Sequence, residues 1–235
     1  MVKVFQIYYN QDQRKTLDPG MIPYFNDSKS IFVENQCFID IRNSTLIEGA
    51  DYVGALSHKF QEKTSNHSTY EHICDCIKSH PGADIFSPKL KNYKFIKQKH
   101  KENKFKYIYE PNQLDMRKKT IPLLRHMADS GIIKRETIRS WMSKFEKPVF
   151  CNFWIARTDI FVDYVDNFLS KVIELVNGYD DDNWVFELDD KYPHTPPEDW
   201  VTETKFETYP IITFIMERLI NIYIIDKQLN HCVWT

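Results

Sequence analysis

A chain of 235 residues with 42% hydrophobic and 14% aromatic content can bury a sizeable core, which fits one α/β domain or a domain with a small subdomain. The formal charge of −2 says nothing about partners, whereas the low count of 6 glycines and the absence of a Gly-rich phosphate-loop motif argue against such a loop. The N-terminus lacks the apolar region of a signal peptide and no apolar run reaches about 18 residues, so we expect a cytoplasmic protein.

Two strands are predicted in the first part of the chain. "VKVFQIYY", residues 2–9, is rich in Val, Ile, Phe and Tyr and predicts the first, central strand. The segment "LDPGMIPYFND" is predicted to be a loop because Pro and Gly interrupt it. "CFIDIR", 37–42, fits a short strand or the end of a helix, and "DYVGALS", 51–57, predicts the second strand.

A helix and a third strand follow. "STYEHICDCIKSH", 68–80, has apolar residues at helical spacing, and Pro81 and Gly82 end it. "ADIFSPK", 83–89, predicts the next strand.

The cysteines and histidines give only a weak metal signal. His72, Cys74 and Cys76 lie together in "EHICDC", but positions two apart on a helix do not share a face, so we favour no metal site there. The odd count of 5 cysteines, without repeated spacing, fits reduced thiols better than a disulfide framework.

Residues 89–119 form a strongly basic segment. They contain eleven Lys/Arg and three acidic residues, which gives a local charge of about +8. Aromatic residues lie between the basic ones, namely Tyr93, Phe95, Phe105, Tyr107 and Tyr109. This interleaving argues against a disordered charge block.

The rest of the chain continues the alternation of elements. In order, we predict helices at 120–131 and 134–146, a strand at 148–156, an amphipathic helix at 157–178, an acidic loop from 179 and a buried helix at 209–228. Strand, polar loop and helix alternate throughout, which predicts an α/β fold of one domain, residues 1–235, with a mostly parallel central sheet flanked by helices.

Three separated stretches match the signatures of one family. A strand followed by H-Y-R-R-[YF] corresponds to "VGALSHKF", and "YNMFI" before a helix with a Tyr and a "WL" pair corresponds to "FCNFWIARTDIFVDYVDNFL". An "ERL" helix near the C-terminus corresponds to "YPIITFIMERLINIYI". The chain thus resembles small glycosyltransferase-like domains from bacterial capsule and lipopolysaccharide loci and related viral proteins. The first stretch departs from the pattern, since Ser57 and His58 replace His-Tyr and Lys59 replaces an Arg pair.

The resemblance implies a GT-A-like (Rossmann-like) glycosyltransferase. Such enzymes move a sugar from a nucleotide-sugar donor, here expected to be UDP-linked, to a hydroxyl acceptor, often with Mn²⁺ or Mg²⁺. By the same resemblance, residues 1–88 are expected to form the nucleotide-sugar-binding half and residues 89–235 the acceptor side.

Polar and cationic residues directly follow the second predicted strand. Ligands of α/β sheets bind at the carboxyl ends of strands, and a diphosphate leaving group needs its charge neutralised. We therefore predict that Ser57, His58 and Lys59 bind the donor and that Lys59 also takes part in catalysis. The alternative is that Lys59 is a solvated surface residue.

Tyr8, Tyr9 and Asn10 end the first strand, where the resemblance places the base and ribose of the donor. A Tyr can stack on a uracil and an Asn can hydrogen-bond its edge, so all three are predicted donor-binding residues. Strand alternation should turn one of the two tyrosines into the core.

Asp84 begins the third strand, roughly where GT-A enzymes carry the D-x-D motif that holds a metal. The triplet here is Asp84-Ile85-Phe86, so the second acid is missing. We predict Asp84 as a catalytic residue and metal ligand, with charge neutralisation by Lys59 or by the basic segment as the metal-independent alternative.

Two polar residues interrupt apolar segments. Asn152 needs partners for its amide, so it is either a backbone clamp or a donor-binding residue that contacts sugar hydroxyls. Glu217 either forms a buried ion pair or acts as the catalytic base for the acceptor hydroxyl.

The basic segment is predicted to bind an anionic acceptor through Lys97, Lys99 and Lys101, with stacking by the aromatic residues. Viral DNA with hydroxymethylated bases fits this description, and so does a lipid-linked or lipopolysaccharide saccharide. A second class of function stays open at this point, a non-catalytic nucleic-acid-binding module whose only functional part is this segment.

Overall fold

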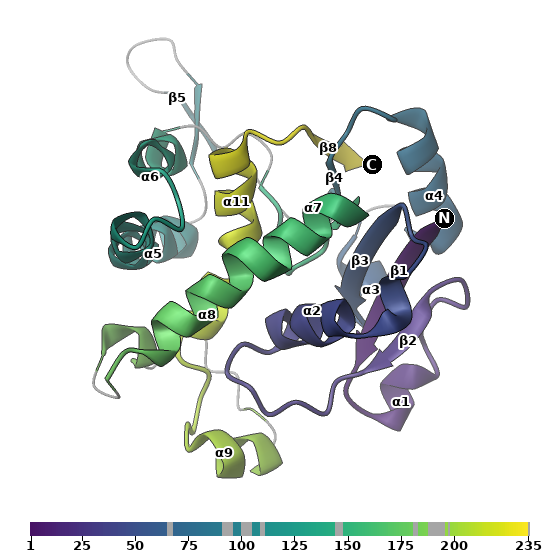
Figure 1. Cartoon of the computed structure of the whole chain (residues 1–235), viewed down its shortest axis with the longest axis horizontal. Coiled ribbons are helices and arrows are strands. Elements are labelled where there is room, and N and C mark those ends of the chain that lie inside the picture. The colour runs from purple at the N-terminus through teal and green to yellow at the C-terminus, as the bar shows by residue number, and fades with distance from the viewer. Residues whose placement is uncertain are drawn as a thin grey trace.

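The computed structural model describes residues 1–64, 68–90, 96–99, 105–108, 111–143, 148–180, 183–187, 196 and 198–234. Figure 1 shows how these parts of the chain are arranged. For residues 96–99, 105–108 and 111–118 only the backbone is described.

Six strands form one mixed sheet in the order β2-β1-β3-β7-β4-β8. Their bounds are β1 (Val2–Tyr8), β2 (Ile22–Phe25), β3 (Tyr52–Ser57), β4 (Ile85–Pro88), β7 (Ile155–Arg157) and β8 (His231–Trp234). Five strands run in the same direction, and β7 is antiparallel to both of its neighbours. The predicted α/β fold with a mostly parallel sheet is therefore confirmed.

Helices connect these strands. Their bounds are α1 (Gln11–Arg14), α2 (Glu34–Asn43), η1 (Thr45–Ile47), α3 (Phe60–Lys63), α4 (Tyr70–Ser79), α5 (Pro111–Asp129), α6 (Arg135–Ser143), α7 (Thr158–Asp163), η2 (Tyr164–Leu169), α8 (Ser170–Asn177), η3 (Trp184–Phe186), α9 (Glu198–Thr204), α10 (Ile211–Met216) and α11 (Leu219–Lys227). The segment η2 is a π-helical stretch that joins α7 to α8 in one long helix, as Figure 1 shows. Among the described residues, no helix combines the length and the apolar character needed to span a bilayer.

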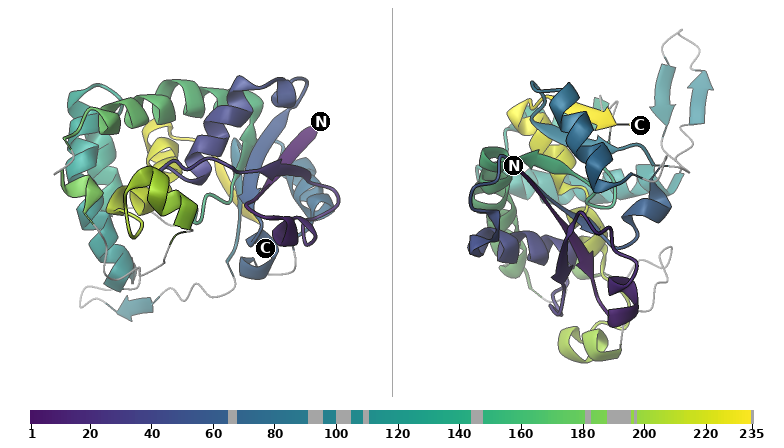
Figure 2. Two further views of the ribbon diagram at one scale, coloured as in Figure 1. Left: turned by 90° about the horizontal axis from the view of Figure 1, so that it is seen from below. Right: turned by 90° about the vertical axis from the view of Figure 1, so that its right-hand side faces the viewer.

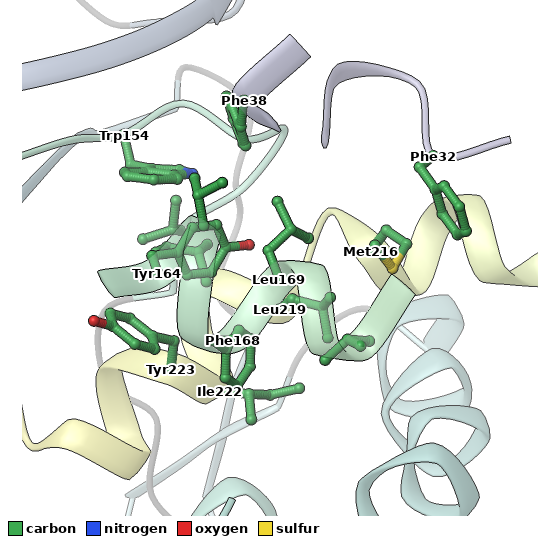
Figure 3. Packing of buried hydrophobic residues seen from close by; sticks show 14 of the residues in the cluster. Phe32, Phe38, Trp154, Tyr164, Phe168, Leu169, Met216, Leu219, Ile222 and Tyr223 are labelled. Carbon is green, nitrogen blue, oxygen red and sulfur yellow. The ribbon is translucent and has the colours of Figure 1, made fainter. Parts of the chain in front are cut away.

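One face of the sheet packs against α2, the α7–α8 helix and α11. The rings of Trp154, Tyr164 and Tyr223 form a chain of edge-to-face contacts in this core, with centroids 5.1 and 5.2 Å apart (Figure 3). The sheet contributes alternate residues to this face, as strand geometry requires: Phe5, Ile7, Val53, Ala55, Ile85 and Ala156.

The opposite face packs against α3 and α4. Its core contains the intervening strand residues, including Val4, Leu56 and Phe86, together with Phe60 of α3 and Ile73 of α4. The sheet therefore lies between two helical layers, and Figure 2 shows this from two further directions.

Three predicted elements differ from the structure. The predicted loop after α1 contains the edge strand β2, where Pro23 is tolerated because β2 pairs on one side only. The predicted strand at 148–156 is mostly irregular, and only its end enters β7. The predicted helix at 209–228 is two helices, α10 and α11, because the chain turns at Glu217 and Arg218.

The basic segment contributes a separate two-stranded antiparallel sheet, β5 (Ile96–Lys99) and β6 (Phe105–Ile108). Figure 2 shows this pair of strands apart from the six-stranded sheet.

Candidate active site

The carboxyl ends of β1 and β3 form the point where the strand order reverses. From β1 the chain goes to β2 on one side, and it then returns to β3 on the other side. In open α/β sheets, ligands bind in the crevice at such a point. Tyr9 and His58 directly follow these two strands, and their rings meet edge to face with centroids 5.8 Å apart. The candidate active site is built around this pair.

Two carboxylates meet at this edge of the sheet. Glu34 is the first residue of α2, and its Oε1 accepts a hydrogen bond of 2.9 Å from the hydroxyl of Tyr9. Glu217 lies at the turn between α10 and α11. Both side chains are half-buried, and the charge of Glu217 acts on Glu34.

Burial and charge shift the pKa of both carboxyl groups upward. Burial and the negative charge of Glu217 raise the pKa of Glu34 from 4.5 to about 7. Burial also raises the pKa of Glu217, against the opposing charges of Arg218 and Lys63. Carboxyl groups with raised pKa values are suited to proton transfer near neutral pH.

A lysine and a thiol lie beside the carboxylates. Lys63, the last residue of α3, places its Nζ 3.5 Å from Sγ of Cys151 and 5.8 Å from the ring centre of Phe153. The positive charge of Lys63 acts on both carboxyl groups and opposes part of the rise in their pKa values. The pKa of the Cys151 thiol is raised to about 11 by burial and by Glu217, which keeps the thiol protonated.

Backbone strain is concentrated at this edge. Cys151 and Asn152 both have φ of 55°, and Val33, directly before Glu34, has φ of 48°. Positive φ is uncommon for any residue with a side chain and is a marked outlier for a β-branched valine. Such strain gathers at functional sites, where the surrounding structure holds it.

Two side chains at this edge have buried polar atoms without a hydrogen-bond partner among the described residues. Asn152 is only 2% exposed, and neither its Oδ1 nor its Nδ2 has a hydrogen-bond partner among the described residues. Nδ1 of His58 is also buried and without a partner in this part of the chain. Burial and the neighbouring Lys59 lower the pKa of His58, so its imidazole is neutral near pH 7. Unsatisfied buried groups of this kind indicate a place for a polar ligand.

The predicted donor-binding residues divide into two groups. Tyr9 and His58 contact each other at the switch point, and the buried Asn152 directly follows Cys151, whose thiol lies beside Lys63. Tyr8 instead packs against Phe25, with ring centroids 5.3 Å apart. Asn10 caps α1 by accepting a hydrogen bond from the backbone of Gln13 at 3.0 Å. Both therefore have a structural role.

Ser57 and Lys59 lie at the carboxyl end of β3, as the sequence predicts. Ser57 is the last residue of β3 and is buried. Lys59 directly precedes α3 and is exposed. Lys63, one helical turn after Lys59, is the lysine whose charge acts on both Glu34 and Glu217.

The structure separates Asp84 from the other predicted site residues. Asp84 precedes β4, so it lies at the amino edge of the sheet, level with the start of β3. Its carboxylate pairs with Arg157 at 3.1 Å and accepts the backbone N–H of Asn230 at 2.9 Å. Arg157 also pairs with Asp159 at 2.7 Å. The same cation therefore holds both carboxylates, and the residues around Asp84 do not fit a Mn²⁺ or Mg²⁺ site.

The predicted acceptor residues are only partly described. Lys97 and Lys99 belong to β5, whose side chains are outside the description, and Lys101 lies outside the described residues. Their role stays a prediction.

Sequence reasoning missed Glu34 as a site residue. Glu34 lies in "SIFVENQCFID", where an acid follows three apolar residues, and only the start of α2 at this point would have drawn attention to it. Lys63 was part of the polar stretch after β3, but its spacing from Lys59, one turn of helix, could not show which of the two lysines faces the site.

The comparison with solved structures supports the fold. The structure titled WbbM bifunctional glycosyltransferase, in its apo form, matches 99% of this chain with a TM-score of 0.55 and 18% sequence identity. The chain spans 44% of the length of that protein. No protein-family model and no curated protein sequence matches the chain. The molecule therefore has a fold similar to that of part of the WbbM structure.

Proposed function

We propose that this protein is a glycosyltransferase that moves a sugar from a nucleotide-sugar donor to a hydroxyl acceptor. The observation that supports this most is the Glu34–Glu217 pair with Lys63, located at the switch point of a glycosyltransferase-like fold. Carboxyl groups with raised pKa values suit proton transfer, and the adjacent cation suits a phosphorylated leaving group.

The proposed reaction assigns a role to each group. The ionised carboxylate of Glu217 takes the proton of the acceptor hydroxyl as its oxygen bonds to the anomeric carbon of the donor. The bond from that carbon to the diphosphate breaks, and Lys63 and Lys59 neutralise the charge that develops there. Tyr9 orients Glu34 through its 2.9 Å hydrogen bond. Asn152 and His58 offer their free polar atoms to donor hydroxyls. No step is assigned to Asp84.

The first experiment measures donor binding. A panel of nucleotide sugars, with UDP-linked ones first, is tested for an increase in the thermal midpoint of the protein, with and without manganese. We expect at least one donor to stabilise the protein. If no nucleotide or nucleotide sugar shifts the midpoint, the proposal is wrong and a non-catalytic binding module becomes the better description.

The second experiment separates chemistry from binding. Glu217→Gln should retain the donor-induced thermal shift but lower turnover at least a hundredfold, in the range of a lost general base. Glu174→Gln, on the exposed surface of α8, is the matched control and should behave as wild type. Full turnover by a folded Glu217→Gln protein would remove Glu217 from the chemistry.

A further inference from the structure

A second cluster of chemically active side chains lies on the opposite face of the sheet from α2. Cys76 is in the last turn of α4, His80 directly follows that helix, and Cys232 is on β8. One ligand atom from each of the three lies within 4.8 Å of the other two. Cys76 and His80 are four positions apart, so they share one face of the helix. The proposed reaction uses none of them.

The atoms and their spacing suit a soft divalent cation. Two cysteine sulfurs and one imidazole nitrogen are ligands that zinc prefers, with bonds of about 2.3 and about 2.0 Å. A tetrahedral ion with those bonds holds sulfur and nitrogen about 3.6 Å apart. Here Sγ of Cys76 and Nδ1 of His80 are 3.9 Å apart, so a shift of a few tenths of an ångström completes the geometry. The thiol of Cys76 also contacts that of Cys232.

The local electrostatics favour a cation as well. The three groups gather at the C-terminal end of α4, where unpaired carbonyls carry partial negative charge. The carbonyl oxygen of Cys76 also lies 3.0 Å from Nδ1 of His80. An ion bound at Nδ1 takes the lone pair of a deprotonated nitrogen, so it replaces this hydrogen bond.

The cluster lies between the edge strand β8 and the helix α4. β8 is the edge strand of the sheet, and β4 is its single neighbour there. Cys76 and Cys232 pack on the core between α4 and the sheet. An ion held by all three side chains would connect the last strand to a helix from the first half of the chain.

We propose that Cys76, His80 and Cys232 form a zinc site that fastens β8 to α4. Binding releases the two thiol protons to solvent, and the fourth coordination position is left to water or to an added ligand. We expect the ion to stabilise the folded chain and to take no part in the proposed glycosyl transfer.

The test uses cobalt as a spectroscopic substitute for zinc. The full chain is purified under reducing conditions, freed of metal and titrated with Co²⁺. We expect thiolate-to-cobalt charge-transfer absorption and the visible bands of tetrahedral cobalt, both saturating at one equivalent and both lost on adding Zn²⁺. Cys76→Ser and Cys232→Ser should abolish the charge-transfer band or halve it, and His80→Ala should weaken binding at least tenfold.

Two neighbours on the same helix serve as matched controls. Cys74→Ser and His72→Ala change the same residue types on other faces of α4 and should leave the cobalt spectrum unchanged. Zinc should also raise the thermal midpoint of the wild type and of Cys74→Ser but not that of Cys232→Ser. If the ligand variants fail to fold, the cobalt titration of the wild type still shows whether the chain binds the metal through thiolates.

Either of two results would contradict the proposed zinc site. One is the absence of cobalt bands in the reduced, folded wild type. The other is a native disulfide between Cys76 and Cys232, seen by mass spectrometry as the loss of two hydrogens from the linked peptides under non-reducing conditions.

Discussion

At the scale of single residues, the most informative feature is a pair of acids that the fold holds together. Glu34 and Glu217 come from opposite ends of the chain. Burial raises the pKa of both, and the charge of Glu217 raises that of Glu34 further. Strongly shifted pKa values cluster at functional sites. The pairing therefore has a consequence for stability that can be measured without knowing the substrate.

We predict that the pair makes the protein less stable as pH rises from about 4.5 to about 7. The pKa of Glu34 is about 7 in the folded chain and 4.5 in the unfolded reference, so the folded state binds more protons in this range and loses that advantage as pH rises. In Glu34→Gln this loss should be absent, so the variant should gain stability relative to wild type between pH 5 and 7.

The measurement is the thermal midpoint of both proteins at several pH values, with Glu174→Gln as the control that keeps the wild-type profile. Parallel profiles for wild type and Glu34→Gln would contradict the raised pKa.

The cations of the site give a second prediction at this scale. Lys63→Ala and Lys59→Ala should each lower turnover at least tenfold, equivalent to about 1.4 kcal/mol of transition-state stabilisation, while the thermal midpoint stays near wild type. Lys171→Ala, an exposed lysine of α8, should have no effect. Because Lys63 faces the carboxylates, wild-type turnover by Lys63→Ala would remove the leaving-group role assigned to it.

At the scale of elements, close packing of strands limits which residues fit. Gly54 lies in the middle of β3, next to β7. A Cβ at this position would be 2.4 Å from Cγ1 of Ile155 and 2.8 Å from the backbone oxygen of Trp154. Backbone cannot move aside as a flexible side chain does, so the glycine is required by the approach of the two strands.

We predict that Gly54→Ala lowers the free energy of unfolding by about 1–3 kcal/mol, the usual cost of overpacking a core. Urea denaturation followed by circular dichroism measures the change. Gly82→Ala is the control, because a Cβ there meets no atom within 4 Å, and its effect should stay within about 0.5 kcal/mol. Equal stability of Gly54→Ala and wild type would mean that β3 and β7 are farther apart than described.

At the scale of the whole molecule, charge is divided unevenly along the chain. Residues 89–119 carry eleven basic and three acidic residues, whereas the full chain has a net charge of −2. The rest of the molecule is therefore acidic, and an anionic acceptor would be attracted to one region and repelled elsewhere.

This division gives the fourth prediction, which concerns the acceptor. If the acceptor is a polyanion, its affinity should fall steeply with salt, with a log–log slope of roughly −3 or steeper. Replacing Lys97, Lys99 and Lys101 together by Gln should flatten the slope and leave donor-induced thermal stabilisation unchanged. The measurement is acceptor binding by fluorescence anisotropy at several salt concentrations, with DNA and an anionic saccharide compared. An unchanged slope, or a neutral saccharide as the preferred acceptor, would contradict this assignment.

Local sequence patterns predicted much of the fold. The apolar runs of β1, β3 and β4, the helical spacing of α4 and the long apolar stripe of α7–α8 are set by neighbours along the chain, so they could be recognised without the structure. The same is true of the polar residues after β1 and β3, since a strand end is marked by where its apolar run stops.

Only the tertiary structure decided which of these residues meet. The direction of each strand places Asp84 at the amino edge beside Arg157, although its sequence position suggested the site. The turn between α10 and α11 places Glu217 where its charge acts on Glu34. No local sequence pattern predicts that these two residues, far apart in the chain, come close in space. Sequence by itself determined most of the elements and the polar character of their ends, because these depend on adjacent residues. It did not determine β2, the irregular stretch before β7 or the break between α10 and α11. The site depends on strand order and direction, which are decided by how the whole core packs.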